Sequence, residues 1–201
     1  TPEGYARNPE LVINFYNERR KQLLDVVPNA GHLGVADLER DFNVTVVTQN
    51  VDNLHERAGS THVIHLHGEL TKVCSSRDPY NPHFVKELAP EEYEVKLGDK
   101  AGDGTQLRPF IVWFGESVPE IETAIRDVEQ ADIFVIIGTS LNVYPAAGLL
   151  NYVPRAAEVY LIDPKPVDTH VMRPIHVIQK GASEGVKELK ALLAATQPPL
   201  L

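Results

Sequence analysis

Residues 44–70 constrain the fold of this chain more than any other stretch. A β-branched run at 44–47 is typical of a buried parallel strand. It ends in the polar segment 48–53, and a second strand is predicted over 62–66. In an open α/β sheet, ligands bind beyond the carboxyl ends of the strands. The sequence therefore predicts a binding site at residues 48–53.

Two histidines, His65 and His67, fall on the same face of the second strand, because side chains alternate along a strand. The residues alone leave three readings open. The histidines could be ordinary polar residues, a pair of metal ligands, or include a general base at the strand end. Zinc needs three or four ligands, and no cysteine-rich or carboxylate-rich motif lies nearby.

Composition is ordinary for a globular protein, with 43% hydrophobic and 23% charged residues. The longest apolar run, 133–137, is far too short to span a bilayer, so we expect neither a membrane segment nor a signal peptide. The single cysteine, Cys74, excludes an intrachain disulfide and fits a cytoplasmic location. A net charge of −9 disfavours nucleic-acid binding through phosphate neutralisation.

Predicted strands and helices alternate along most of the chain. Asn8 and Pro9 are typical of a helix start, as N-cap and first helical residue. Further helices are predicted over 28–40, 54–58, 119–130 and 184–194 and from Pro145, and further strands over 110–115, 132–137, 159–163 and 176–179. Proline and glycine residues in 71–107 predict turns and loops throughout. The alternation predicts an α/β fold with a doubly wound parallel, Rossmann-like sheet and a small inserted module.

Five motifs follow one another along the chain. They are Thr48-Gln49-Asn50-Val51-Asp52-Asn53-Leu54-His55, Leu66-His67-Gly68-Glu69-Leu70, Val112-Trp113-Phe114-Gly115-Glu116, Gly138-Thr139-Ser140 and Val143-Tyr144-Pro145-Ala146-Ala147. Their order and spacing resemble those of the sirtuins, the NAD-dependent protein lysine deacylases. The resemblance covers most of the chain from Tyr5 to about Ala182.

The resemblance implies an enzyme that transfers the acyl group of a modified lysine to the ADP-ribose part of NAD and releases nicotinamide. His67 would be the general base, with Asn50 and Asp52 as the other catalytic residues. Cofactor contacts are implied at Gln49, Asn50, Val51, Asp52, Gly138, Thr139, Ser140, Asp163 and Ala182. Glycine and small hydroxyls between a strand and a helix, as at 138–140, form a phosphate cradle in many nucleotide folds.

Tyr16 and Arg19 lie three residues apart on a predicted helix, so they share a face. By themselves they read as a core-edge aromatic and a solvated charge. The pair is, however, similar to the Tyr-x-x-Arg of the sirtuin branch that prefers succinyl, malonyl and glutaryl groups, a bacterial class III-like branch. A guanidinium binds a carboxylate in bidentate fashion and a phenol adds one donor. We therefore expect desuccinylase or demalonylase activity beside deacetylase activity.

The resemblance also implies a site for the acylated peptide. Contacts to this peptide are implied at Val112, Trp113, Phe114, Gly115, Glu116, Val143 and Tyr144. The segment 112–116 would pair with the peptide as an added strand, which gives affinity with little sequence demand. Val112 and Phe114 would help to wall the tunnel for the acyl-lysine. We expect acylated-lysine proteins or peptides as partners, no nucleic acid, no membrane, and a monomeric protein.

The segment 71–109 stands where a typical sirtuin inserts a zinc ribbon with two cysteine pairs. Here Cys74-Ser75-Ser76-Arg77 replaces the first pair, and 100–104 lies near the position of the second. One thiolate cannot build a four-cysteine site, so we expect no zinc. A mixed site of Cys74 and His83 is the alternative. The module would then be held by packing of Tyr80, Phe84, Val85, Tyr93 and Leu97.

The start of the chain departs from the family pattern. A sirtuin begins with a strand, Gly-Ala-Gly-x-Ser and a long cofactor loop, and nothing similar precedes Thr1. We expect 1–201 to be a single catalytic domain that is incomplete at its amino end and binds NAD poorly as written. Residues 1–42 would form a helical segment that carries the acyl-specificity residues. Two other functions stay open: a non-catalytic module that binds acyl-lysine or nucleotide, and an NAD glycohydrolase.

Overall fold

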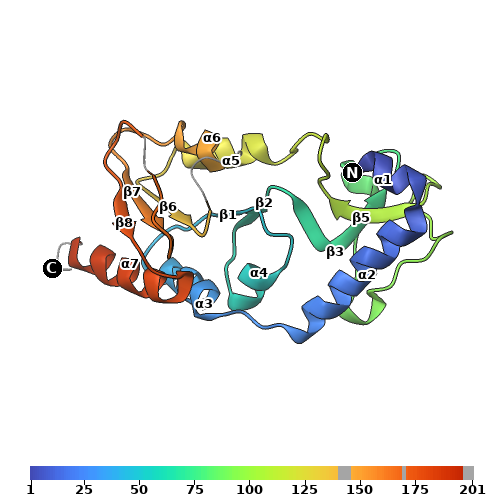
Figure 1. Ribbon diagram of the computed structural model, residues 1–201, viewed down its shortest axis with the longest axis horizontal. Coiled ribbons are helices and arrows are strands. Elements are labelled where there is room, and N and C mark those ends of the chain that lie inside the picture. Colours follow the sequence, from blue (N-terminus) through green and yellow to red (C-terminus); the bar gives the residue numbers. More distant parts are fainter. Residues whose placement is uncertain (140–145, 169–170, 197–201) are drawn as a thin grey trace. The chain divides into compact units, whose positions relative to one another are not determined.

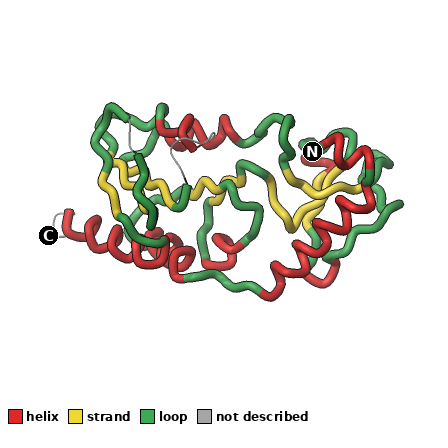
Figure 2. The backbone as a smooth tube through the Cα atoms, in the orientation of Figure 1, coloured by secondary structure: helices red, strands yellow, loops and turns green. Residues whose placement is uncertain are grey.

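The computed structural model describes residues 1–139, 146–168 and 171–196 of the chain (Figures 1 and 2). Two compact units interleave along the sequence. Unit 1 comprises Thr1–Val27, Val47–Leu54 and Val63–Glu120, and unit 2 comprises the described residues of Pro28–Val46, His55–His62 and Ile121–Leu201. The helical segment predicted at 1–42 is thus divided between the two units. Within the described residues, no helix combines the length and the hydrophobicity that a membrane span requires.

Unit 2 holds the parallel sheet that the sequence predicts. Its strands are β6 (Ile133–Ile137), β7 (Glu158–Ile162) and β8 (His176–Ile178), which lie side by side in that order. Both neighbouring pairs run parallel, with Ile137 opposite Ile162 and Tyr160 opposite His176. The predicted strands are confirmed, each within a residue of its expected bounds, and so is the α/β class.

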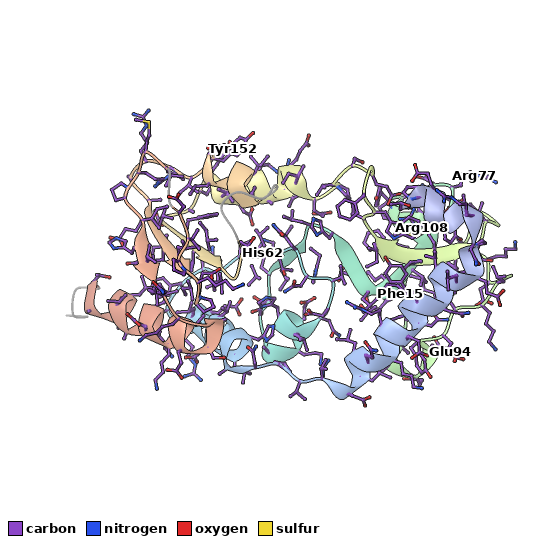
Figure 3. All side chains as sticks on the ribbon, viewed as in Figure 1. Phe15, His62, Arg77, Glu94, Arg108 and Tyr152 are labelled. Atoms are coloured by element: carbon purple, nitrogen blue, oxygen red, sulfur yellow. The ribbon has the colours of Figure 1, made fainter. Side chains whose placement is uncertain are left out.

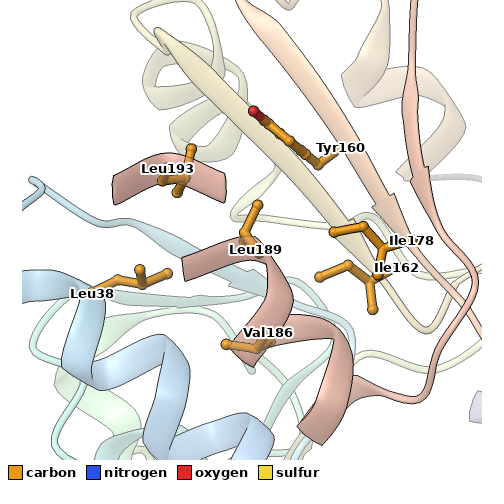
Figure 4. Packing of buried hydrophobic residues seen from close by; sticks show 7 residues of the cluster. All are labelled: Leu38, Tyr160, Ile162, Ile178, Val186, Leu189 and Leu193. Carbon is orange, nitrogen blue, oxygen red and sulfur yellow. The ribbon is translucent and has the colours of Figure 1, made fainter. Parts of the chain in front are cut away.

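Helices cover both faces of this sheet (Figure 1). They are α3 (Ala30–Asp37) and α7 (Ala182–Thr196) on one face, and α5 (Ile121–Val128) and α6 (Ala146–Leu150) on the other. A buried cluster joins the first face to its helices: Leu38, Tyr160, Ile162, Ile178, Val186, Leu189 and Leu193 (Figure 4). Gly34 permits the close approach of α3 to α7, because a Cβ there would lie 2.7 Å from Val186 Cγ1. Leu192 of α7 is outside this cluster and is 41% exposed.

Unit 1 begins with α1 (Pro2–Arg7) and α2 (Pro9–Asp25). The start predicted for α2 is confirmed, since the Asn8 side chain accepts the Leu11 N–H at 3.1 Å. Its buried residues are Ile13, Asn17, Arg20 and Leu23, two of them polar. Phe15, which has the spacing of the apolar residues of this helix, is 55% exposed.

The buried polar residues of α2 hold a distant segment of unit 1. Asn17 Nδ2 donates to the Val95 carbonyl at 2.8 Å, and Asn17 Oδ1 accepts the Val95 N–H at 2.9 Å. Arg20 Nε donates to the Tyr93 carbonyl at 2.8 Å, and its Nη2 donates to Asn17 Oδ1 at 2.7 Å. Burial lowers the pKa of Arg20 to about 10, so the guanidinium is still charged at neutral pH. These bonds give the loop at 93–95 backbone partners that a strand would otherwise supply.

The prediction of loops throughout 71–107 was wrong. Strand β3 (Gly68–Ser75) pairs antiparallel with β4 (Val85–Glu87) and β5 (Leu107–Ile111), in the order β4-β3-β5. Local turn signals conceal this sheet because its strands pair across long loops. Cys74 and Ser75 in β3 are fully buried.

The packing of this module also differs in part from the expected one. Val73 and Val95 form a buried cluster with Ile13 of α2. Leu97, expected to pack, is 51% exposed, whereas the Tyr80 ring lies edge-on to Phe110 at 6.3 Å between centroids. The module is therefore anchored on α2 mainly through valines and through the backbone bonds of 93–95.

A two-stranded sheet is formed by β1 (Val46–Thr48) and β2 (Val63–His65). Along the sequence, α4 (Leu54–Ala58) follows β1 and precedes β2, and it has the predicted bounds. Gly59 ends this helix with a φ of +109°, and the Ser60 N–H bonds back to the His55 carbonyl at 3.0 Å. The valines of β1 are only half-buried, so this strand is more exposed than predicted.

Candidate functional site

His67 lies where the chain leaves β2 and enters β3, and it is half-buried. Its Nδ1 lies 3.1 Å from the Gln49 carbonyl oxygen. Because a carbonyl oxygen only accepts, Nδ1 carries the hydrogen, and Nε2 of the neutral ring is left as the proton acceptor. The His67 carbonyl accepts the Val112 N–H at 2.9 Å. His67 is thus held by its ring through Gln49 and by its backbone through Val112. The ring nitrogen that can accept a proton, Nε2, takes no part in the bond to Gln49.

His65 makes the equivalent bond one residue further along the loop. Its Nδ1 lies 3.1 Å from the Asn50 carbonyl, and its Nε2 lies 3.9 Å from Glu69 Oε1. Unlike His67, it is only 7% exposed. The two imidazoles therefore shape the same loop, but only His67 combines that bond with partial exposure.

The loop at 48–53 is held by its own backbone and side chains. The Asn50 N–H bonds to Thr48 Oγ1 at 3.0 Å, and Asp52 Oδ1 accepts the Leu54 N–H at 3.0 Å at the start of α4. The Val51 carbonyl accepts the Leu70 N–H at 2.8 Å. Asn50 itself is exposed, and within the described residues Asn53 Oδ1 is buried without a hydrogen-bond partner. The loop therefore presents polar groups while its backbone is fixed.

The segment 112–116 does not continue the strand as predicted, because β5 ends at Ile111. The chain turns instead, with the Glu116 N–H bonded to the Trp113 carbonyl at 2.9 Å and a φ of +90° at Gly115. Glu116 Oε1 accepts the Trp113 N–H at 2.8 Å, which closes the turn from its other end. Phe114 at the tip is 91% exposed.

Tyr16 and Arg19 lie in the same unit as His67 and the 112–116 segment. The Tyr16 hydroxyl accepts the Trp113 indole N–H at 3.0 Å. Arg19 is exposed, with its guanidinium 5.8 Å from the centroid of the Phe15 ring. Since Val112 bonds to His67 and its neighbour Trp113 bonds to Tyr16, the structure links the predicted acyl residues to the predicted base through two adjacent residues.

Other predicted cofactor residues belong to unit 2. Gly138 and Asp163 directly follow the paired strand ends Ile137 and Ile162, at the carboxyl edge of the parallel sheet. The Gly138 N–H bonds to the Ile162 carbonyl at 3.0 Å, and Asp163 Oδ1 accepts the Lys165 N–H at 2.8 Å. Thr139 follows Gly138, and Ala182 begins α7. Ser140, Val143 and Tyr144 lie outside the described residues.

Arg108 is a residue of this region that the sequence reasoning missed. It is 4% exposed, and its two terminal nitrogens each bond to a Glu116 oxygen at 2.9 Å. The guanidinium also lies 3.8 Å from the centroid of the Trp113 ring. Figure 3 shows Arg108 at β5 and Phe15 on α2. An arginine two residues before the predicted strand 110–115, with a glutamate eight residues later, was the signal available in the sequence.

The charges of this pair support each other. Burial alone would lower the pKa of Arg108, but the bonds to Glu116 and its negative charge outweigh that effect and raise it. Burial alone would raise the pKa of Glu116, but the Arg108 bonds and the Trp113 N–H outweigh it and lower it. Both groups are therefore charged at neutral pH, and the turn at 113–116 is held by a bidentate ion pair.

Comparisons with known proteins agree with this geometry. The sequence model of the Sir2 family matches residues 1–145. A protein named NAD-dependent protein deacylase from Bacteroides thetaiotaomicron is 82% identical over 193 residues, which cover 96% of this chain and 82% of that protein. A solved Sir2 homologue–NAD complex has a TM-score of 0.80 at 35% identity, covering 98% of this chain and 77% of that one. A Sir2–p53 peptide–NAD+ complex has a TM-score of 0.76 at 25% identity, covering 96% and 82%. The chain belongs to the Sir2 family.

Proposed function

We propose that this protein is an NAD-dependent protein-lysine deacylase that moves the acyl group of a modified lysine to the ADP-ribose part of NAD and releases nicotinamide. The observation that carries the proposal is the His67 ring, whose Nδ1 bonds to the Gln49 carbonyl at 3.1 Å and whose Nε2 can therefore take a proton. The family membership and the relative with 82% identity, itself named NAD-dependent protein deacylase, support it.

The polar groups of the 48–53 loop fit NAD. The exposed Asn50 amide offers hydrogen bonds to ribose or carboxamide groups, and so does Asn53 Oδ1, which has no partner among the residues that the structure describes. Asp52 is held in place by its bond to the Leu54 N–H. In unit 2, Gly138 and Asp163 follow adjacent parallel strands, the usual place for a nucleotide. NAD, when bound, supplies the ribose carbon that accepts the acyl oxygen as nicotinamide leaves.

His67 would act after this first step. A sugar hydroxyl is a poor nucleophile until a base removes its proton. Nε2 of a neutral imidazole can accept that proton near neutral pH. The bond to the Gln49 carbonyl holds the ring in the tautomer that this task needs.

One assay distinguishes this function from its alternatives. Full-length protein is incubated with NAD and an acetyl-lysine, succinyl-lysine or unmodified peptide, and nicotinamide and free lysine are measured. A deacylase releases both only with acylated peptide. An NAD glycohydrolase releases nicotinamide with the unmodified peptide as well, and a non-catalytic module binds acylated peptide without releasing nicotinamide.

The acyl preference rests on Tyr16 and Arg19. We propose that the two residues bind the free carboxylate of a succinyl or malonyl group, so that the enzyme removes acidic acyl groups as well as acetyl. The exposed guanidinium of Arg19 is available for a bidentate bond. The Tyr16 hydroxyl accepts from Trp113, which leaves its own hydrogen for a ligand.

Arg19→Met is expected to lower kcat/KM for the succinyl peptide by about tenfold to a hundredfold, since a hydrogen bond to a charged group contributes about 1.5–3 kcal/mol. The acetyl peptide has no carboxylate and should be affected less than about threefold. Arg7→Met, the same change at another exposed arginine of unit 1, is the control and should affect neither peptide. Equal losses for both peptides would contradict the acidic-acyl assignment.

We also propose that the 71–109 module needs no zinc. Zinc binds the thiolate form of cysteine, and burial raises the pKa of the Cys74 thiol to about 12. Ser75 Oγ instead donates to Asp103 Oδ2 at 2.6 Å, and Thr105 Oγ1 donates to Asp103 Oδ1 at 2.6 Å. Elemental analysis of the purified protein should find substoichiometric zinc, and a chelator should leave the unfolding temperature unchanged. One zinc per chain would contradict the proposal.

The expected partners follow from the same site. We propose that the substrates are acylated-lysine proteins or peptides and that a cytoplasmic monomer acts on them. The net charge of −9 favours basic, lysine-containing segments over nucleic acid. Size-exclusion chromatography with light scattering measures the molar mass of the protein in solution, and we expect the mass of a monomer.

A further inference from the structure

Tyr16 is hydrogen-bonded in a way that decides what else its hydroxyl can do. The Trp113 indole nitrogen lies 3.0 Å from the Tyr16 oxygen. An indole N–H is a donor and never an acceptor, so the Tyr16 oxygen must accept in this bond. A phenol has a single hydrogen and uses its lone pairs to accept. The Tyr16 hydrogen is therefore not consumed by Trp113.

Within the described residues, Trp113 is the only hydrogen-bond partner of the Tyr16 hydroxyl. Had that partner been a carbonyl or carboxylate oxygen, the Tyr16 hydrogen would have been consumed. A carboxylate of an acyl group accepts and cannot donate when ionised. Trp113 thus leaves the Tyr16 hydroxyl free to donate its hydrogen to a carboxylate. The bond from Trp113 also polarises the O–H, which makes it a stronger donor.

The direction of the indole N–H is set by contacts that do not involve Tyr16. Trp113 is 6% exposed, its ring lies 5.3 Å from that of Tyr5, and the Arg108 guanidinium lies 3.8 Å from its centroid. Arg108 is itself held by Glu116 and by the Ile111 carbonyl, the latter at 2.8 Å. A buried ring that is packed between other side chains has little rotamer freedom. The N–H is therefore positioned before any substrate arrives.

We propose that Trp113 is a specificity-determining positioning residue, whose indole N–H keeps the Tyr16 hydroxyl a donor toward the carboxylate of an acidic acyl group. This inference rests on the proposed deacylase function and on the roles of Tyr16 and Arg19. Trp113 acts through Tyr16 and touches no substrate in this role. An acetyl group has no carboxylate, so its removal does not depend on the bond.

Trp113→Phe tests the inference, because phenylalanine keeps an aromatic ring beside Tyr5 and Arg108 and removes only the N–H and the second ring. We expect the ratio of kcat/KM for the succinyl peptide to kcat/KM for the acetyl peptide to fall about threefold to tenfold, the effect of one hydrogen bond. Tyr16→Phe should lower succinyl turnover too. Adding Trp113→Phe to Tyr16→Phe should lower succinyl turnover by less than about twofold further, since the Trp113 N–H acts only through the Tyr16 hydroxyl.

The same experiment separates the possible failures. Equal losses for the two peptides, or losses in the double variant that multiply, would show that Trp113 serves packing only and would overturn the inference while the deacylase function stands. Turnover of neither peptide by the parent protein would refute the proposed function and the inference with it. A succinyl preference unchanged in Trp113→Phe would overturn the inference alone.

Fluorescence gives a readout that does not depend on turnover. Trp113 is the only tryptophan of the chain, so all tryptophan emission comes from this residue. We expect the succinyl peptide to shift the emission wavelength of Trp113 in the parent protein. In Tyr16→Phe this shift should be much smaller. An identical shift in both proteins would contradict coupling through the Tyr16 hydroxyl.

Discussion

Replacing His67 with alanine is expected to lower deacylation by about a hundredfold to ten-thousandfold, the range that a general base contributes. The variant removes Nε2, which we propose takes the proton of the ribose hydroxyl. It also removes the bond from Nδ1 to the Gln49 carbonyl. His67 is half-buried, so the lost bond should lower stability by only about 0.5–1.5 kcal/mol. Release of free lysine from the acylated peptide measures the first effect, and thermal unfolding measures the second.

His67→Asn is the matched control for the alanine variant. An asparagine amide can donate to the Gln49 carbonyl much as Nδ1 does, but it has no basic nitrogen. Both variants should therefore lose turnover to a similar extent, while the asparagine variant stays closer to the parent in stability. Activity retained in His67→Asn would show that the ring serves only to hold the 48–53 loop, and the proposed base would be wrong.

The parts of the fold that could be predicted are those coded by neighbouring residues. The Asn8 cap and Pro9 fix the start of α2, and α4 has the bounds expected from its Gly59 stop. The parallel strands β6 to β8 are also local signals, since each is a short apolar run. Such elements need no knowledge of the rest of the chain.

The missed elements depend on partners far away in sequence. Asn17 and Arg20 look like solvent-facing residues of α2 until Val95 and Tyr93 supply carbonyls from 78 and 73 residues away. Strand β3 forms because β4 and β5 pair with it, and no local pattern shows those pairings. Phe15 is the reverse case. It is an apolar residue of α2 with the spacing of a core residue, yet its side chain is exposed.

The candidate site shows the same division. The motif containing His67 predicts this residue as the base, but the bond between its Nδ1 and the Gln49 carbonyl required coordinates. The 112–116 motif predicts a strand, whereas the bonds of Glu116 to Arg108 and to the Trp113 N–H hold this segment as a turn. The sequence therefore predicts which groups form the site, and only the structure shows how each group is held.

The second large effect is expected at Gly68, the residue that directly follows His67. Gly68 has a φ of +88°, and a Cβ there would lie 2.1 Å from the Phe110 carbonyl oxygen. Gly68 also pairs with Ile111 across β3 and β5, so the clash is with backbone and cannot be relieved by a rotamer change. Gly68→Ala should lower the free energy of unfolding by about 3–5 kcal/mol, from strain at positive φ and overpacking together.

Gly98→Ala separates these two causes. Gly98 has a similar φ of +98°, but no atom lies within 4 Å of the position of an added Cβ. It should therefore show only the cost of the left-handed backbone, about 1–2 kcal/mol. Urea unfolding of both variants gives the difference, and equal losses would contradict the close approach of β3 to β5. Because the His67 carbonyl is bonded to Val112, the strand shift in Gly68→Ala should also lower turnover, whereas Gly98→Ala should leave it unchanged.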